Sequence, residues 1–117
     1  MRIGIVGSRG YQNSQAIKDF IMNLPNDTVI ISGGARGADS LAEYWAYVKQ
    51  LKTLIIKPNW RANGKKAGFL RNTTIVENSD EIVAFWDGRS RGTLDTINKA
   101  RSVGKKVTII GLNPVSK

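Results

Sequence analysis

An apolar run that stops at a glycine-rich turn constrains this chain more than any other stretch. Val29, Ile30 and Ile31 are β-branched and predict a buried strand. The turn that follows, over residues 32–39, reads Ser-Gly-Gly-Ala-Arg-Gly-Ala-Asp, and an amphipathic helical pattern begins at its end. Glycines have no Cβ atom, so backbone N–H groups in such a turn can approach an anion, and a helix N-terminus attracts the same charge. The stretch predicts a phosphate-binding loop; the alternative is a tight strand-to-helix turn that binds nothing.

Strand and helix patterns alternate along the whole chain. We predict strands over residues 2–6, 28–32, 53–56, 81–86 and 106–110, and helices over residues 14–24, 38–50, 67–78 and 93–103. The longest irregular connection is expected between residues 58 and 66. Alternation of this kind indicates a parallel sheet with right-handed crossovers and helices on both faces. The sequence therefore predicts one α/β domain over residues 1–117. We expect a Rossmann-like, three-layer fold whose five-stranded parallel sheet has the order 3-2-1-4-5.

The residue types that are absent exclude several kinds of chemistry. The 117 residues include no cysteine and no histidine, which excludes Ser-His-Asp and Cys-His catalysis and cysteine-based zinc sites. The formal net charge of +9 favours an anionic partner such as a nucleotide or a nucleic acid, and solvated surface charge is the alternative. Because no long apolar run or signal-peptide pattern is present, we expect a cytoplasmic protein without membrane contact. We predict no metal and no cofactor.

Three glycine-bearing loops follow the first, second and fourth predicted strands, over residues 7–11, 33–39 and 87–93. In open parallel sheets, ligands bind beyond the carboxyl ends of the strands at the switch point, which the first strand occupies in the predicted order. The spacing of Gly4, Gly7 and Gly10 is not G-x-G-x-x-G, and the chain has no G-x-x-x-x-G-K-[ST] motif. These departures argue against the usual dinucleotide dehydrogenases and P-loop NTPases.

The loops supply the groups that a nucleotide needs. Glycine N–H groups and arginine side chains would bind phosphate, serine hydroxyls would donate hydrogen bonds, and Asp39 and Asp87 would accept them from ribose. Trp60 is interpreted either as a base-stacking residue or as a hydrophobic plug of its loop. The candidate catalytic residues are Arg71, Asp39 and Asp87. The candidate ligand-binding residues are Gly7, Ser8, Arg9, Ser32, Gly33, Gly34, Arg36, Gly37, Asp39, Trp60, Arg71, Asn72, Asp87, Gly88, Ser90, Gly92 and Thr93.

The run over residues 32–39 resembles the signature of the SLOG superfamily, which includes the DNA-processing protein A group and the Lonely Guy nucleotide phosphoribohydrolases. Residues 7–9, 67–72 and 85–93 resemble the small YspA/YpsA-related branch of that superfamily. The resemblance implies a nucleotide-derived ligand, such as an NAD-derived or cyclic signalling nucleotide, that the chain senses or sequesters. It also implies a homo-oligomer, a dimer or higher, and Tyr44 and Tyr47 are candidates for the interface.

Two alternative functions remain open. The Lonely Guy branch hydrolyses the N-glycosidic bond of nucleoside monophosphates, and Arg71, Gly92 and Thr93 match its motifs. Asn72 stands where that branch has a lysine, and Thr96 stands where it has the catalytic glutamate. A nucleotide-processing N-glycosidase, or phosphoribohydrolase, is therefore the first alternative. The DNA-processing branch binds single-stranded DNA, which a basic rim with nearby aromatic side chains would suit. A single-stranded DNA-binding protein is the second alternative.

Overall fold

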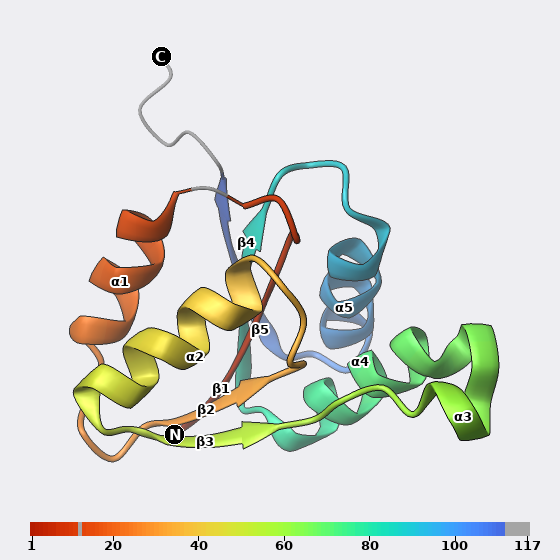
Figure 1. Cartoon of the computed structure of the whole chain (residues 1–117), viewed down its shortest axis with the longest axis horizontal. Coiled ribbons are helices and arrows are strands. Elements are labelled where there is room, and N and C mark those ends of the chain that lie inside the picture. Colours follow the sequence, from red (N-terminus) through yellow and green to blue (C-terminus); the bar gives the residue numbers. More distant parts are fainter. Residues whose placement is uncertain (12, 112–117) are drawn as a thin grey trace.

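The computed structural model describes residues 1–11 and 13–111, in which five parallel strands form one sheet (Figure 1). The strands are β1 (Arg2–Gly7), β2 (Val29–Ser32), β3 (Lys52–Ile55), β4 (Glu81–Trp86) and β5 (Lys106–Gly111). The α-helices are α1 (Ser14–Met22), α2 (Ala38–Lys49), α3 (Trp60–Asn63), α4 (Ala67–Asn78) and α5 (Arg91–Ser102). The strand order is β3-β2-β1-β4-β5, which confirms the predicted Rossmann-like sheet.

Helices cover both faces of the sheet, with α1 and α2 on one side and α4 and α5 on the other (Figure 1). Side chains of a strand alternate between the two faces, so the central strand β1 contributes to both cores. Ile5 packs with Ile17 and Phe85 on the α1–α2 side, whereas Val6 packs with Ile97 on the α4–α5 side. The three layers therefore hold β1 in the middle of the molecule, with its carboxyl end at the rim.

Side-chain caps set the starts of two helices that flank this rim. The Asn13 side chain accepts a hydrogen bond from Ala16 N at 3.2 Å at the start of α1, and Ser90 caps α5 through Thr93 N. An N-cap of this kind satisfies a backbone N–H that has no partner inside the helix. No helix in the part of the chain that the structure describes is long and apolar enough to cross a bilayer.

The connection between β3 and α4 is more regular than the sequence predicts. It contains the short helix α3 and a single 3₁₀ turn over Gly64–Lys66. The Asn59 side chain caps α3 by accepting a hydrogen bond from Ala62 N at 3.1 Å. Neither element buries a residue, so no hydrophobic periodicity marks them in the sequence. The consequence for the site is that Trp60, the first residue of α3, lies beside α4 at the rim.

Candidate functional site

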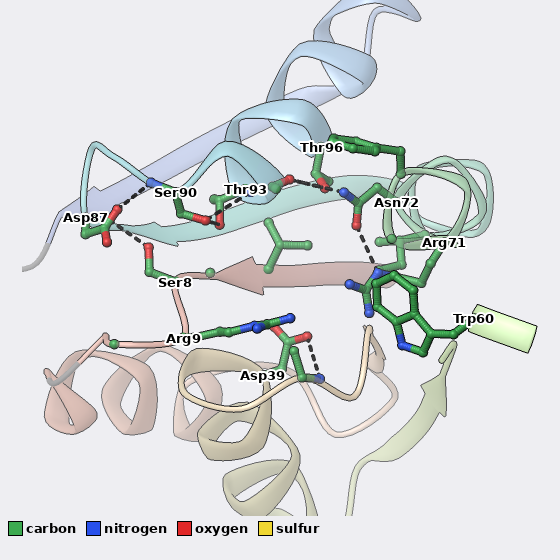
Figure 2. Close-up of a pocket in the computed structure, with 18 of the residues that line it drawn as sticks. Ser8, Arg9, Asp39, Trp60, Arg71, Asn72, Asp87, Ser90, Thr93 and Thr96 are labelled. Carbon is green, nitrogen blue, oxygen red and sulfur yellow. Dashed lines mark hydrogen bonds between the residues drawn. The ribbon is translucent and has the colours of Figure 1, made fainter. Parts of the chain in front are cut away.

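The carboxyl ends of β1 and β4 and the glycine-rich loop after β2 open into a cavity of about 460 Å³, here called the rim cavity (Figure 2). Its walls come from all three β–α loops and from α3, α4 and α5. The polar and aromatic residues that line it are Ser8, Arg9, Asp39, Trp60, Lys65, Phe69, Arg71, Asn72, Asp87, Ser90, Thr93 and Thr96. The convergence that the strand order predicts is therefore present in the structure.

Ser8 joins the three loops at the floor of the rim cavity. Its carbonyl oxygen accepts a hydrogen bond from Ala38 N, at the start of α2, at 3.2 Å. Its Oγ accepts a hydrogen bond from Asp87 N, after β4, at 3.1 Å. Ser8 is 1% exposed, so these bonds are shielded from water and fix the relative positions of the loops.

Two glycines are needed for the packing of these loops. A Cβ atom at Gly7 would overlap the Ala38 side chain, so this glycine lets β1 approach α2 closely. Gly37 has a φ of 76°, and a Cβ atom there would overlap the backbone of Arg9. Gly37 is therefore a packing glycine with a left-handed backbone conformation, which only glycine adopts without strain.

The β4–α5 loop aims a helix N-terminus at the rim cavity. Asp87 Oδ1 accepts hydrogen bonds from Arg89 N and Ser90 N, both at 2.8 Å, and the N–H groups of Ser90 and Arg89 lower the pKa of Asp87. Ser90 Oγ in turn accepts a hydrogen bond from Thr93 Oγ1 at 3.1 Å. The first turn of α5, with Gly92 and Thr93, lines the cavity, so the positive end of the helix dipole lies there.

Arg71 and Asn72 connect α4 to two other elements. Arg71 Nη1 donates to the Gly33 carbonyl oxygen at 2.5 Å, and Arg71 Nε donates to Asn72 Oδ1 at 3.0 Å. Asn72 Nδ2 donates to Gly92 O at 3.1 Å and to Asp95 Oδ2 at 3.2 Å. The Asn72 amide is thus engaged with protein atoms, and its position holds the Arg71 guanidinium between the glycine-rich loop and α5.

Asp39 is a buried carboxyl group beside this guanidinium. It is 5% exposed, and its Oδ2 accepts a hydrogen bond from Ala35 N at 3.2 Å. Burial raises the pKa of Asp39 to about 6, against the lowering effects of the Ala35 N–H and the Arg71 charge. Burial also lowers the pKa of Arg71, and the nearby Arg9 charge adds to this effect. Figure 2 shows the Arg9 side chain extending past Asp39 toward Arg71.

A second cavity of about 390 Å³, here called the basic cavity, adjoins the rim cavity. It lies between the glycine-rich loop after β2 and the segment that follows β3. The two cavities share Arg9, Ala35, Trp60 and Arg71, and the basic cavity is completed by Gly33, Gly34, Arg36, Lys57 and Pro58. The groups shared by both cavities thus include two guanidinium groups and one indole ring.

The structure brings most of the predicted ligand-binding residues to one of the two cavities. Those that line the rim cavity are Gly7, Ser8, Arg9, Asp39, Trp60, Arg71, Asn72, Asp87, Ser90, Gly92 and Thr93. Gly33, Gly34 and Arg36 line the basic cavity. The remaining three, Ser32, Gly37 and Gly88, line neither. Ser32 is fully buried and its Oγ donates to Glu43 Oε2 at 2.7 Å.

The lining residues that were not predicted from the sequence include two lysines and one phenylalanine. Lys57 lines the basic cavity, whereas Lys65 and Phe69 line the rim cavity. The signal for Lys57 was available, because it lies just beyond the carboxyl end of β3, on the edge of the sheet where ligands bind. Lys65 reaches the cavity through the path of the β3–α4 connection, which the sequence pattern does not predict. Phe69 lies on the first turn of the predicted helix α4.

A family model described as the YspA, cpYpsA-related SLOG family matches residues 1–62. Gene 61 protein of Mycobacterium phage D29 is 35% identical over 123 residues, which cover 97% of this chain and 98% of the phage protein. The chain belongs to the YspA, cpYpsA-related SLOG family. The family resemblance of the glycine-rich signature is thereby confirmed.

Solved structures show that this SLOG chain shares its fold with larger proteins. DNA processing protein A (DprA) from Streptococcus pneumoniae has a TM-score of 0.81 and 23% identity over 92% of this chain and 49% of that one. DprA from Helicobacter pylori, studied for its single-stranded DNA binding mode, has a TM-score of 0.79 and 20% identity over 93% of this chain and 64% of that one. The protein TM1055 has a TM-score of 0.69 and 19% identity over 91% of this chain and 71% of that one. The SLOG chain spans about half the length of the first DprA chain.

Thr96 is, with Asn72, one of two positions at which this SLOG chain departs from the Lonely Guy motif. Thr96 is 1% exposed and its Oγ1 donates to the Gly92 carbonyl oxygen at 3.3 Å, so a hydroxyl occupies the place of the glutamate. The neighbouring Asp95 forms an ion pair with Lys99 at 2.8 Å. The carboxylates that line the rim cavity are instead Asp39 and Asp87.

Proposed function

We propose that this chain is a single SLOG-like nucleotide-binding domain over residues 1–117 that holds a phosphate-bearing, nucleotide-derived ligand in the rim cavity. It would act as a sensor of this ligand or would sequester it. The observation that carries the proposal is the convergence of three β–α loops, the start of α5 and the Arg71 guanidinium on one cavity of about 460 Å³. Cavities of this size commonly hold small-molecule ligands.

The lining of the rim cavity supports a specific orientation of such a ligand. A phosphate group fits at the first turn of α5, beside Gly92, where backbone N–H groups and the helix dipole favour an anion. Arg71 adds a cation that can bind phosphate. Trp60 and Phe69 are 54% and 50% exposed and offer aromatic surface for stacking a base. The Asp87 carboxylate is an acceptor for a ribose hydroxyl.

Single-stranded DNA binding is the second candidate function. It is favoured by the fold likeness to DprA and by the basic cavity, which extends the lining of the rim cavity toward β3. Under this proposal the two cavities would follow a nucleic-acid backbone, and the exposed aromatic side chains would stack bases. Its affinity would then fall steeply with salt.

Equilibrium dialysis against a mixed panel tests these functions together. The panel contains nucleoside monophosphates, NAD, ADP-ribose, cyclic nucleotides and a single-stranded dodecamer, and mass spectrometry quantifies the bound, free and altered species. We expect one nucleotide class to be retained intact, and its retention to be lost in Arg71→Gln but not in Arg101→Gln, an exposed arginine of α5. Thermal unfolding of both variants checks that they fold.

The other outcomes of the dialysis contradict this proposal in different ways. Release of a free base would establish an N-glycosidic hydrolase, in which Asp39 or Asp87 would serve as the carboxylate. Retention of the dodecamer alone, with steep salt dependence, would establish the DNA-binding function. Absence of any retained or altered species would overturn all three.

A further inference from the structure

The basic cavity differs from the rim cavity in its balance of charge. Arg9, Arg36, Lys57 and Arg71 line it, and no carboxylate from the described part of the chain does. The rim cavity contains both signs of charge, because Asp39 and Asp87 are among its lining residues. Within residues 1–11 and 13–111, the ion pair closer than 4 Å is Lys99–Asp95, so none of the four cations of the basic cavity is paired in this way. Asp39, beside Arg71, offsets part of this charge, and the four cations leave the cavity with an excess of positive charge.

Two of these cations are held close together by the protein. Arg71 is fixed by its hydrogen bonds to Gly33 O and Asn72 Oδ1, and Arg9 extends toward it (Figure 2). Burial lowers the pKa of Arg71, the Asp39 charge opposes this effect, and the Arg9 charge adds to it, as expected for two neighbouring guanidinium groups. An anion placed between them would replace this repulsion by attraction to both groups.

The glycine-rich loop gives the basic cavity its floor. A Cβ atom at Gly33 would lie 2.5 Å from Arg71 Nη1, so this glycine lets the guanidinium lie directly on the loop. Gly34 has a φ of 70°, and a Cβ atom there would lie 3.1 Å from both Ile55 and Lys57. Both glycines thus keep space open beside Arg71 and Lys57.

We propose that the basic cavity is a second phosphate subsite and that the ligand carries two separate phosphate groups. One phosphate would lie at the start of α5 in the rim cavity, and the other between Arg36 and Lys57, with Arg9 and Arg71 contacting the ligand between them. This inference rests on the proposed function of the rim cavity. A nucleoside 3′,5′-bisphosphate and a linear dinucleotide with a 5′-phosphate both have this chemistry.

Isothermal titration with AMP, adenosine 3′,5′-bisphosphate and the dinucleotide pApA tests the second subsite. Each charge-assisted contact is worth about tenfold in affinity or more, so we expect both two-phosphate ligands to bind at least about tenfold more tightly than AMP. The ligand that binds more tightly, adenosine 3′,5′-bisphosphate or pApA, identifies whether the second phosphate belongs to a bisphosphate or to a dinucleotide. The double variant R36Q/K57Q should lose this gain and bind AMP as the wild type does, because neither residue lines the rim cavity.

The matched control is the double variant R101Q/K106Q, which also removes one arginine and one lysine. Both residues are exposed, on the last turn of α5 and at the start of β5, and line neither cavity. This control should keep the gain in affinity for two-phosphate ligands. An equal loss in the control would overturn the subsite, because the gain would then be a general charge effect.

Other outcomes concern the wild type. Equal wild-type affinities for AMP and the two-phosphate ligands would overturn the subsite and leave the proposed function of the rim cavity standing. Affinity that rises steadily from pApA to a dodecamer would replace the subsite by a nucleic-acid track, and no binding of any ligand would overturn both proposals.

Discussion

Asp39 is the residue whose ionisation most opposes folding. Its pKa rises from 3.8 to about 6 because the fold buries it, so the folded chain retains a proton at pH values where the unfolded chain has lost it. The stability that the protonated group contributes is therefore present below about pH 3.8. It falls as the pH rises through 6, by about 3 kcal/mol at most, since each pKa unit corresponds to about 1.4 kcal/mol.

Replacing Asp39 by asparagine removes this penalty and keeps a side-chain oxygen for the Ala35 N–H. We compare the unfolding free energy of Asp39→Asn with that of the wild type at about pH 4 and at about pH 7.5. We expect this difference to shift in favour of the variant by about 1–3 kcal/mol when the pH is raised. Urea unfolding at both pH values measures this difference. Asp27→Asn removes an exposed carboxylate and is the control, with a much smaller change expected. A difference for Asp39→Asn that does not vary with pH would contradict the raised pKa.

At the scale of single residues, the sequence identified the loops that line the two cavities but not the contacts of every residue within them. Ser32 was predicted to donate to a ligand, and the structure has it donating to Glu43, which is eleven positions away on α2. Gly37 was predicted to offer its N–H group, and it lines neither cavity because it lies against Arg9. Both roles depend on which elements touch in three dimensions, and the spacing of residues in the loop carries no information about that.

The start of α5 is the element on which the proposed phosphate position depends. Among the residues that the structure describes, nothing lies within 4 Å of a Cβ atom built at Gly92, so alanine fits there and favours the helix by up to about 1 kcal/mol. The added methyl group would occupy the space where phosphate approaches the N–H groups. We expect Gly92→Ala to fold with an unchanged or higher melting temperature and to bind the retained ligand about tenfold more weakly, as measured by titration.

Asn98→Ala is the control for this change, because Asn98 is exposed on the same helix and lines neither cavity. It also raises helix propensity, and we expect ligand affinity to stay at the wild-type value. If Gly92→Ala binds the ligand with wild-type affinity, the phosphate does not lie at the start of α5.

The regular elements could be predicted because most have a strong local signal. β1, β2, β4 and β5 contain runs of β-branched apolar residues, and the long helices each place apolar side chains on one face. β3 is an exposed edge strand of the sequence Lys-Thr-Leu-Ile and has a weaker signal. The helix α3 has no such signal, since its four residues are exposed and its cap is a single side chain, Asn59. The position of Trp60, and with it the shared wall of the two cavities, therefore could not be predicted.

At the scale of the whole molecule, assembly into a homo-oligomer stays a prediction. Tyr44 and Tyr47 are 56% and 79% exposed on α2, which would leave large aromatic surface in water in a monomer. We expect sedimentation velocity to show a dimer or higher state, and the double variant Y44S/Y47S to shift it toward the monomer. Val103→Ser removes another exposed apolar side chain, outside α2, and should leave the assembly unchanged. A monomer at all concentrations in the wild type would contradict the prediction.

The strand order made it possible to predict that distant loops meet at one rim. It did not make it possible to predict that this rim holds two cavities. Once β1 lies between β2 and β4, the loops that follow these strands share one rim. The division into a rim cavity and a basic cavity depends on Arg71, which reaches Gly33 from 38 positions along the chain. A pairing of that range is a property of the folded molecule, and neither periodicity nor spacing encodes it.

The glycine-rich signature serves two separate purposes, and they are subject to different selection. Gly7 and Gly37 allow close contact between the end of β1 and the start of α2. A descendant that bound nothing would therefore still need both glycines in order to fold. Gly34 has a left-handed backbone conformation, so it too is needed for the fold. A Cβ atom at Gly33 would displace only side-chain atoms of Arg71 and Asp39, so Gly33 is free to drift once no ligand is bound. A relative that retains the other three glycines and has lost Gly33 would therefore keep the architecture without the chemistry. In a comparison of relatives, Gly33, and not the signature as a whole, marks those that still bind.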